Sequence, residues 1–436
     1  MVSNKITQNT LADDPLYELV KVCYEFVAPN EIDDHFKRIQ RLQQPEVIHS
    51  SSSVLNQGDS GIQFADLFCG AGGLSLGFEL EGAVCKYALD HDSSSLSTFA
   101  INRPKNVEIS HSDIRSVLKQ KTVFPNVPLV IGGPPCQGFS LANQQPLESD
   151  PRNRLYIDFL QLAERFHSKV VVIENVPGIL KYWDRIQFDL NSRGFSSRVF
   201  QLDAYDFGVP QKRVRVFIVA VKGLKQKNAE SFLNHVSLGI DNQRVEFDQT
   251  NLEAALYGLP SLEAKTIRNS THLENSEFGY TIGPVSKATN KYLDRINRDF
   301  SKGFIFNHRT KFNNPRDINL FKCLKPGEYT TSEAFAELNP YKNRDHIFKD
   351  KFFRLHAKRP SKTITAHMYY DCHMYIHPTQ HRGLTPREAA RVQGFPDQYL
   401  FLGKPNEWYR QIGNSVSPLV GRVIARSILN AIKIHL

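Results

Sequence analysis

Long hydrophobic runs are missing from this sequence of 436 residues. No apolar stretch approaches the roughly 18 residues that a membrane-spanning helix requires. The first 14 residues are polar and acidic, whereas a secretory signal is first basic and then apolar. We therefore expect an unexported, cytoplasmic protein with no membrane partner.

Cysteine is sparse, and its six occurrences form no CxxC pair. Their scatter argues against a zinc ribbon, which needs closely spaced cysteines, and also against the dense disulfide framework of a small secreted protein. Low-complexity composition is missing as well, since 41% of the residues are apolar, 11% aromatic and 23% charged, as in folded globular proteins. Each cysteine is then either a small core residue or part of a chemical site.

Acidic residues are outnumbered by basic ones, 45 against 54, which gives a net charge of +9. The excess is uneven, because residues 1–60 hold five basic and nine acidic side chains. A basic surface favours a polyanionic partner such as nucleic acid. The first 60 residues are the part least suited to bind one.

The order of predicted elements indicates an α/β fold. Residues 11–27 have helical periodicity, and a second amphipathic stretch precedes a polar linker that ends near residue 60. Beyond it, short apolar strands alternate with helical segments, the pattern of a Rossmann-like parallel sheet with helices on both faces. The predicted strands span residues 62–68, 84–90, 129–132, 169–176 and 214–221.

A change of composition marks an insertion. We predict a sheet domain that begins at residues 61–221, a smaller inserted domain at 222–353 and a return to the sheet domain at 354–436. Within the insert, residues 286–316 carry eight basic and two acidic side chains among aromatic ones, which suits either nucleic-acid contact or a small core. In the returning segment, Thr385 opens a predicted capping box, and a Pro-initiated helix over residues 416–434 ends the chain.

A glycine-rich loop follows the first predicted strand, with the sequence Asp66-Leu67-Phe68-Cys69-Gly70-Ala71-Gly72-Gly73. Glycines between a strand and a helix let a ligand approach the backbone closely. The next strand ends at Asp90, where nucleotide-binding folds place a carboxylate that accepts hydrogen bonds from ribose. The loop lacks GxGxxG spacing and the Lys-Ser/Thr pair of a phosphate-binding loop, so an adenosine-type ligand and a plain structural turn both remain open.

A second loop, Gly132-Gly133-Pro134-Pro135-Cys136-Gln137-Gly138, follows a buried strand and carries a thiol. We refer to it as the Pro-Cys loop. Open α/β folds bind ligands at the carboxyl edge of the sheet, where this loop lies. That position favours Cys136 as a nucleophile over a buried core cysteine.

Polar side chains also stand at the ends of the neighbouring strands. Glu174 closes the next buried strand, where burial would raise the pKa of its carboxyl and keep it a proton donor. Gln211, Arg213 and Arg215 alternate along the start of the following strand and therefore share one face. A solvated strand start is the other interpretation of these three residues.

Three histidines, His373, His377 and His381, recur at a spacing of four residues, which on a helix would align metal ligands. Pro378 lies between them, and residues 374–376 have strand character. The three side chains would then share no helical face. We therefore expect no metal site here.

Six motifs, in order, resemble those of the C5-cytosine DNA methyltransferases. They are the glycine loop from Asp66 to Gly73, Gly133-Pro134-Pro135-Cys136-Gln137, Glu174-Asn175-Val176, Gln211-x-Arg213-x-Arg215, Arg387-Glu388-Ala389-Ala390-Arg391-x-Gln393-Gly394-Phe395-Pro396-Asp397 and Gln411-Ile412-Gly413-Asn414-Ser415-Val416. The resemblance covers residues 64–220 and 354–436. It implies a prokaryotic modification-type enzyme with a target-recognition domain at residues 222–353, and it gives residues 1–60 no counterpart in the minimal form of the family.

The resemblance also implies S-adenosylmethionine as methyl donor and assigns residues to it. The glycine loop would hold the methionine part, Phe68 the adenine face, Asp90 the ribose and Asp113 the adenine edge. Asp90 stands where the family more often has Glu, which shortens the reach but keeps the charge. The full cofactor-binding set is Phe68, Cys69, Gly70, Gly72, Gly73, Leu74, Asp90, His91, Asp113, Ile114, Pro134, Asn414, Ser415 and Val416.

The chemistry that the resemblance implies is a covalent reaction on a cytosine flipped out of double-stranded DNA. Cys136 would add to C6, Glu174 would support N3 and N4, and Arg213 would stabilise the adduct or the phosphate beside it. The full catalytic set is Cys136, Glu174, Asn175, Gln211, Arg213 and Arg215. The enzyme would act as a monomer on nucleoid DNA, as part of a restriction-modification system.

Three other functions stay open from the sequence alone. An RNA methyltransferase acting on transfer RNA could use the same catalytic set, although the large insert favours duplex DNA. A non-catalytic binding protein is disfavoured because Cys136, Glu174 and Arg213 are all present. A nicotinamide-dependent oxidoreductase is disfavoured by the glycine spacing.

Overall fold

The structure is a computed structural model that describes residues 61–103, 107–135, 155–245, 250–268, 273–284, 288–299, 304–329 and 352–436. The predicted helices and linker of residues 1–60 lie outside this part of the chain, and so does Cys136. No helix within the described ranges is long and apolar enough to cross a membrane.

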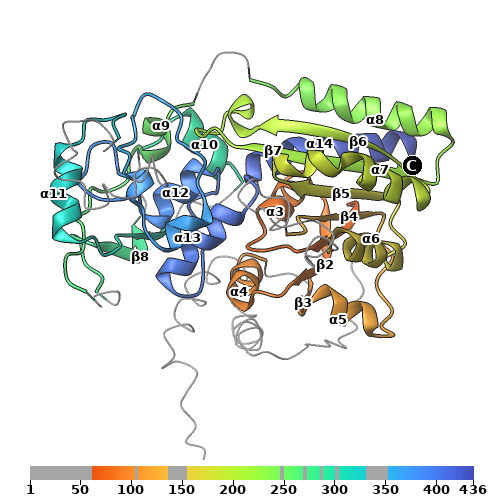
Figure 1. The fold of residues 1–436 in the computed structure, drawn as a ribbon, viewed down its shortest axis with the longest axis horizontal. Coiled ribbons are helices and arrows are strands. Elements are labelled where there is room, and N and C mark those ends of the chain that lie inside the picture. Colours follow the sequence, from red (N-terminus) through yellow and green to blue (C-terminus); the bar gives the residue numbers. More distant parts are fainter. Residues whose placement is uncertain are drawn as a thin grey trace, which may run out of the picture.

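A seven-stranded sheet forms the centre of the larger lobe (Figure 1). Its strands are β1 (Gln63–Leu67), β2 (Val84–Asp90), β3 (Glu108–His111), β4 (Leu129–Gly132), β5 (Val170–Asn175), β6 (Phe195–Asp203) and β7 (Val214–Lys222), in the order β3-β2-β1-β4-β5-β7-β6. The first five in this order are parallel, whereas β7 runs antiparallel to β5 and β6. The predicted fold class and all five predicted strands are confirmed. The sequence does not predict β3 and β6, because neither contains a continuous apolar run. β3 has only four residues, and β6 is an edge strand with polar positions.

Alternate residues of the strands belong to two apolar layers, one on each face of the sheet. In β5, Val170 and Val172 belong to one cluster and Val171 and Ile173 to the other, as the two-residue repeat of a strand requires. The first layer is covered by α3 (Gly73–Glu79), α4 (Ser93–Ile101), α8 (Gln226–Asp241) and α14 (Pro418–His435). The second is covered by α5 (Ile114–Lys119), α6 (Leu155–Arg165) and α7 (Trp183–Ser192), and the turns η5 (Pro177–Tyr182) and η6 (Ala204–Phe207) follow β5 and β6. With helices on both faces, the strand ends are left for a site.

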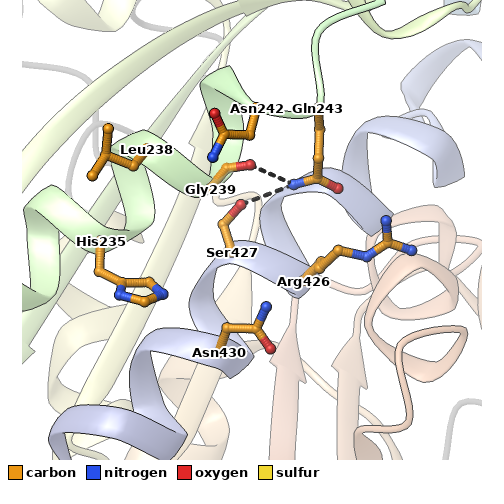
Figure 2. Close-up of a pocket in the computed structure, with 8 residues that line it drawn as sticks. All are labelled: His235, Leu238, Gly239, Asn242, Gln243, Arg426, Ser427 and Asn430. Carbon is orange, nitrogen blue, oxygen red and sulfur yellow. Dashed lines mark hydrogen bonds between the residues drawn. The ribbon is translucent and has the colours of Figure 1, made fainter.

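α14 closes the first layer by packing against α3 and α8. A Cβ atom at Gly77 would lie 2.3 Å from a backbone carbon of Gly421, so α3 and α14 touch at backbone level. Between α8 and α14, the Gln243 amide donates to the Gly239 carbonyl at 2.8 Å and to the Ser427 hydroxyl at 3.1 Å (Figure 2). The composition boundary at residue 222 assigns α8 to the insert. Its contacts with α14, β6 and β7 place it on the sheet domain instead.

The other elements form a smaller lobe beside the sheet (Figure 1). They are α9 (Leu252–Leu256), β8 (Gly279–Pro284), α10 (Lys291–Asn297), β9 (Phe304–Arg309), α11 (Pro315–Cys323), η9 (Ala366–Tyr369), η10 (His373–Tyr375), α12 (Pro386–Val392) and α13 (Pro405–Asn414). β8 and β9 pair antiparallel, and α12 packs on β9, α9 and α13. α12 and α13 therefore lie with the insert, although the sequence assigns residues 354–436 to the sheet domain.

Local predictions for the returning segment have mixed outcomes. The capping box is present, because the Thr385 side chain accepts from the Glu388 N–H and the Glu388 carboxylate from the Thr385 N–H. The predicted terminal helix is α14, which has Pro418 in its first turn. The strand predicted at residues 374–376 is wrong. The Tyr375 N–H donates to the Cys372 carbonyl at 2.9 Å and closes the turn η10.

Candidate active site

Three predicted site segments meet at the carboxyl ends of adjacent strands. Leu67 of β1 pairs with Gly132 of β4, and Gly132 pairs with Ile173 of β5. The glycine loop, the described part of the Pro-Cys loop (Gly133 to Pro135) and Glu174 come directly after these three partners. They therefore lie in one row at one edge of the sheet.

The glycine loop has an unusual backbone between Phe68 and Gly73. The φ angles of Phe68, Gly70 and Gly72 are 65°, 53° and 82°, a region that glycine accepts and phenylalanine disfavours. Among the residues that the structure describes, no heavy atom would lie within 4 Å of a Cβ atom at Gly70, so none of them fills the space beside this residue. A Cβ atom at Gly73 would lie 2.3 Å from the Val416 carbonyl oxygen. The predicted cofactor-binding residues Asn414, Ser415 and Val416 make up what we call the C-terminal segment, which therefore touches the loop.

Asp90 ties the glycine loop to the end of β2. Its Oδ2 accepts from the Gly70 N–H at 2.8 Å, and its Oδ1 accepts from the Asp92 N–H at 2.9 Å. The exposed ring of His91 lies 3.3 Å from Oδ1, and its hydrogen bond to Asp90 raises the pKa of His91. Oδ2 keeps a lone pair for a second donor.

The other predicted cofactor residues near the loop divide into exposed and buried ones. Asp113 caps α5, and its half-exposed carboxylate forms an ion pair with Arg115 at 3.2 Å. Partial burial raises the pKa of Asp113, but the hydrogen bonds from Arg115 outweigh it and the net pKa is lowered. Cys69, Leu74 and Ile114 are buried, and burial raises the pKa of the Cys69 thiol well above its usual value. The side chains of these three residues are therefore packed in the interior rather than open to solvent.

Glu174 projects from the end of β5 toward Gly133 and Arg215. A Cβ atom at Gly133 would lie 2.9 Å from Glu174 Oε2, so a side chain at that position would displace the carboxylate. Arg215 Nε lies 3.3 Å from Oε1. Burial raises the pKa of Glu174, and the charges of Arg215 and Arg213 oppose this only in part.

Asn175 shapes the loop that leads to Cys136. Its side-chain amide donates to the Pro134 carbonyl at 3.2 Å, and its Oδ1 accepts from the Val176 N–H at 2.8 Å. These bonds hold Pro134 beside the end of β5. Cys136 lies outside the described residues, so its nucleophilic role stays a prediction from the sequence.

Arg213 donates to the backbone rather than to Glu174. Its Nη atoms donate to the carbonyls of Ile364 at 2.7 Å and of Gly413 and Ser415 at 2.9 Å each. Burial and the nearby charge of Arg215 lower the pKa of Arg213 to about 9. Arg215 is the arginine whose guanidinium forms an ion pair with Glu174.

Gln211 joins the same support of the C-terminal segment. It is fully buried, and its amide contacts the Gln393 side chain. Gln393 Nε2 in turn donates to the Ser415 carbonyl at 2.6 Å. That carbonyl is thus held by both Arg213 and Gln393, while Asn414 is exposed at the end of α13.

Sequence reasoning missed the residues that support the glycine loop from the interior. Arg103 donates to the Gly72 carbonyl at 2.9 Å, and the Tyr399 hydroxyl donates to the Ala71 carbonyl. Neither supporting residue belonged to the set expected to bind the cofactor, and Tyr399 is 328 positions from Ala71. Only the folded chain brings them together, so no local signal could have found them.

The three regularly spaced histidines do not come together as metal ligands. His377 lies 3.6 Å from Glu388, and burial lowers its pKa to about 4. His373 lies 3.5 Å from Asp317 instead. In the part of the chain that the structure describes, no group of three or more His, Cys, Asp and Glu side chains could hold a metal ion.

Two cavities, of about 400 and 470 Å³, lie away from the strand ends. The first lies between α8 and α14, where His235, Asn242, Arg426 and Asn430 are among its lining residues (Figure 2). The second lies beside α9 and α10. None of the predicted site residues lines either cavity.

Comparison with known proteins gives a family for this arrangement. A family model described as C-5 cytosine-specific DNA methylase matches residues 62–430. The chain belongs to this family. It is a DNA (cytosine-5)-methyltransferase, and the resemblance carried by the six motifs is confirmed. The family depends on S-adenosylmethionine, which sets the class of cofactor.

Individual relatives of this methyltransferase match along most of their length. The type II methyltransferase M.DdeI of Desulfomicrobium norvegicum is 32% identical over 388 residues, which cover 83% of this chain and 87% of that protein. M.AgeI of Thalassovita gelatinovora is 32% identical over 431 residues, with 84% and 99% covered. A crystal structure described as a DNA modification methyltransferase encoded within an E. coli prophage superposes with a TM-score of 0.62 at 25% identity, with 86% and 100% covered. These matches do not favour the RNA alternative.

Proposed function

We propose that this methyltransferase modifies a cytosine flipped out of a specific double-stranded DNA sequence, as the modification enzyme of a restriction-modification system. The row formed by the glycine loop, the Pro-Cys loop and Glu174 carries the proposal. It would bring methyl donor, nucleophile and acid together in one site. The names of the type II relatives support the modification role.

The proposed chemistry starts at C6, because C5 of cytosine is a weak nucleophile until a group adds beside it. The Cys136 thiolate forms a bond to C6, and the ring gains electron density toward N3, where Glu174 donates a proton. C5 of the resulting enamine accepts the methyl group, which S-adenosylmethionine supplies when bound. Loss of the C5 proton to solvent base then breaks the C6–S bond and releases the thiolate. N3 returns its proton to the Glu174 carboxylate, which restores the neutral aromatic ring and the acid.

The neighbours of Glu174 have separate tasks in this proposal. The raised pKa of Glu174 favours the protonated carboxyl that the reaction needs. Arg215 orients that carboxyl through the 3.3 Å ion pair, and Asn175 shapes the Pro-Cys loop through Pro134. Arg213 and Gln211 hold the backbone of the C-terminal segment and so act on the cofactor side.

The cofactor would lie along the glycine loop. The open space beside Gly70 fits the close approach of the methionine part, and the free Oδ2 lone pair of Asp90 fits a ribose hydroxyl. The half-exposed carboxylate of Asp113 can accept from the adenine amine. Asn414, exposed beside the segment that touches Gly73, suits the amino-acid end.

The smaller lobe is the proposed target-recognition region. Lys291 and Arg298, at the two ends of α10, are exposed and suit phosphate contact. Tyr292 and Phe306 are buried, so these two aromatic residues belong to the core of the lobe rather than to a base-stacking surface. Phosphate contacts of this kind would make DNA binding weaken steeply as the salt concentration rises. We also propose that the enzyme acts as a monomer on DNA in the nucleoid.

Expression in a bacterial host that lacks 5-methylcytosine, followed by bisulfite sequencing, tests the function. We expect methylation within one short sequence by the wild-type enzyme and none by Cys136→Ser, because a hydroxyl is a far weaker nucleophile than a thiolate. Cys323→Ser is the matched control, since Cys323 is exposed at the end of α11 in the smaller lobe. Methylation by Cys136→Ser, or methylated transfer RNA beside unmethylated DNA, would contradict the proposal.

A further inference from the structure

A buried cluster of Glu79, Arg103 and Tyr399 lies under the glycine loop, and the proposed reaction gives it no task. We call it the support cluster. The Arg103 side chain is 5% exposed, and its Nε donates to the two Glu79 oxygens at 2.8 and 2.9 Å. Its guanidinium lies 3.9 Å from the centre of the Phe99 ring. Burial lowers the pKa of Arg103, but Glu79 and Tyr399 raise it by more, so the guanidinium stays charged.

The support cluster also donates to carbonyls of the glycine loop, and Arg103 Nη1 donates in addition to the Phe99 carbonyl of α4 at 3.3 Å. Arg103 Nη2 donates to the Gly72 carbonyl at 2.9 Å, and Nη1 donates to the Tyr399 hydroxyl at 3.0 Å. A guanidinium has no acceptor, so the Tyr399 hydroxyl must accept from Arg103 and give its own proton to the Ala71 carbonyl. The direction of every hydrogen bond in the chain from Glu79 to Ala71 is therefore fixed.

The loop needs such support because its backbone is strained. Phe68 has a positive φ without being a glycine, and conformations of this kind persist only where the surroundings over-determine them. The support cluster binds the loop on its inner side, whereas no atom of the described residues would lie within 4 Å of a Cβ atom at Gly70. A Cβ atom at Gly72 would lie 2.5 Å from Arg103 Nη1, so the loop and the cluster are matched in shape.

Tyr399 reaches the loop from a segment that is anchored in the smaller lobe. Two residues further on, the Phe401 carbonyl accepts from the Asn307 amide and the Phe401 N–H donates to the Asn307 Oδ1, both at 2.9 Å. Asn307 lies on β9. The shape of the glycine loop thus depends on both lobes.

We propose that Arg103 and Tyr399 are positioning residues for S-adenosylmethionine, which hold the glycine loop in its cofactor-binding shape without contact to the cofactor. The inference rests on the proposed function, in which this loop binds the methionine part. Loss of the support releases the strained loop to other conformations. The binding-competent conformation must then be restored when the cofactor binds, which weakens affinity.

Tyr399→Phe tests the proposal, because it removes one hydroxyl and keeps the ring that packs on Phe395 and Phe401. With S-adenosylmethionine in isothermal titration calorimetry, we expect Kd to rise about three- to tenfold, the effect of one hydrogen bond. KM for the cofactor should rise with Kd, and kcat should change less than about twofold, since the substituted group touches no reacting atom. Tyr409→Phe is the matched control, because its buried hydroxyl donates to the Leu384 carbonyl at 2.9 Å, outside the support cluster.

Arg103→Lys is the second variant, since lysine keeps the charge but lacks the planar fork that reaches Glu79, the Gly72 carbonyl and the Tyr399 hydroxyl together. It should weaken binding in the same direction, and it decides the question if Tyr399→Phe fails to fold. Unchanged Kd in both variants, or an equal loss in Tyr409→Phe, would overturn the positioning role while leaving the proposed function intact. A wild-type protein that does not bind S-adenosylmethionine would refute the proposed function itself.

Discussion

Arg213 and Arg215 show how far residue-level prediction reaches. The sequence places both on one face at the start of the strand that follows Glu174, and the structure confirms the β7 strand there. The antiparallel direction of β7 brings this strand start to the same edge of the sheet as the end of β5. Which of the two arginines pairs with Glu174 depends on backbone carbonyls up to 202 positions away in the chain. These carbonyls accept hydrogen bonds from Arg213, and Arg215 forms the ion pair with Glu174. Residue type and spacing therefore predict that the two arginines share a face of the strand start, and only the fold decides which of them faces the acid.

Replacing Arg215 with Met should slow methyl transfer at least about tenfold, because Glu174 loses its orienting partner. The lost positive charge should also raise the pKa of Glu174 further. Since the protonated form is the active one in the proposed reaction, activity falls as pH rises through this pKa. The alkaline limb of the kcat profile should therefore move to higher pH, as single-turnover assays across about pH 6 to 9 would show.

Arg213→Met is the contrast to this variant. It removes the donor to the Ile364 and Gly413 carbonyls, each of which costs about 1–3 kcal/mol when left unpaired, whereas the Ser415 carbonyl keeps its bond from Gln393. Urea unfolding should therefore show a stability loss of roughly 2 kcal/mol or more. Arg215→Met should leave the urea midpoint almost unchanged, because the Arg215 side chain is partly exposed to solvent at the edge of the core. The reverse pattern, with a stable Arg213→Met and an unstable Arg215→Met, would show that the two roles are exchanged.

At the scale of elements, buried strands and glycine loops could be predicted because their signals are local. The run Val170–Asn175 is apolar until its last two residues, and the loop glycines follow a strand directly. The sequence could not predict that α8 packs on the sheet domain. Its amphipathic pattern shows that one face of the helix is buried, but it does not show which element covers that face. Its partner α14 lies about 180 residues later. The turn η10 looks like a strand for the same reason, since tertiary contacts override three residues of local preference.

The crossing of α3 and α14 offers a test at this scale. Gly77→Ala would place a Cβ atom 2.3 Å from backbone carbon of α14, which cannot yield as a side chain can. We expect a loss of about 3 kcal/mol in the free energy of unfolding, larger than the roughly 1 kcal/mol that alanine gains in helix propensity. Gly421→Ala is the paired variant at the same crossing, where the nearest atom would lie 3.2 Å away. Its loss should be clearly smaller, and equal losses in chemical denaturation would argue against a backbone contact.

At the scale of the whole molecule, the insert and the sheet domain share one core. A single apolar cluster includes Phe64 of β1, Phe232 of α8, Phe306 of β9 and Ile424 of α14. Composition identifies where an insertion enters the chain, but it says nothing about whether the core stops at that point. The structure shows that it does not. The smaller lobe is therefore expected to unfold together with the sheet domain.

The two tryptophans of the chain can test this coupling, because one lies in each lobe. Trp183 begins α7 on the sheet, and Trp408 is buried in α13 of the smaller lobe. In Trp408→Phe the fluorescence reports the sheet domain, and in Trp183→Phe it reports the smaller lobe. For each variant we expect the fluorescence midpoint in urea to coincide with its own circular-dichroism midpoint, which controls for any stability change caused by the substitution.

S-adenosylmethionine at about 100 times Kd should stabilise both variants alike, by about 2.7 kcal/mol. If the smaller lobe instead unfolds first, or gains nothing from the cofactor, then Tyr399 does not couple the insert to the glycine loop.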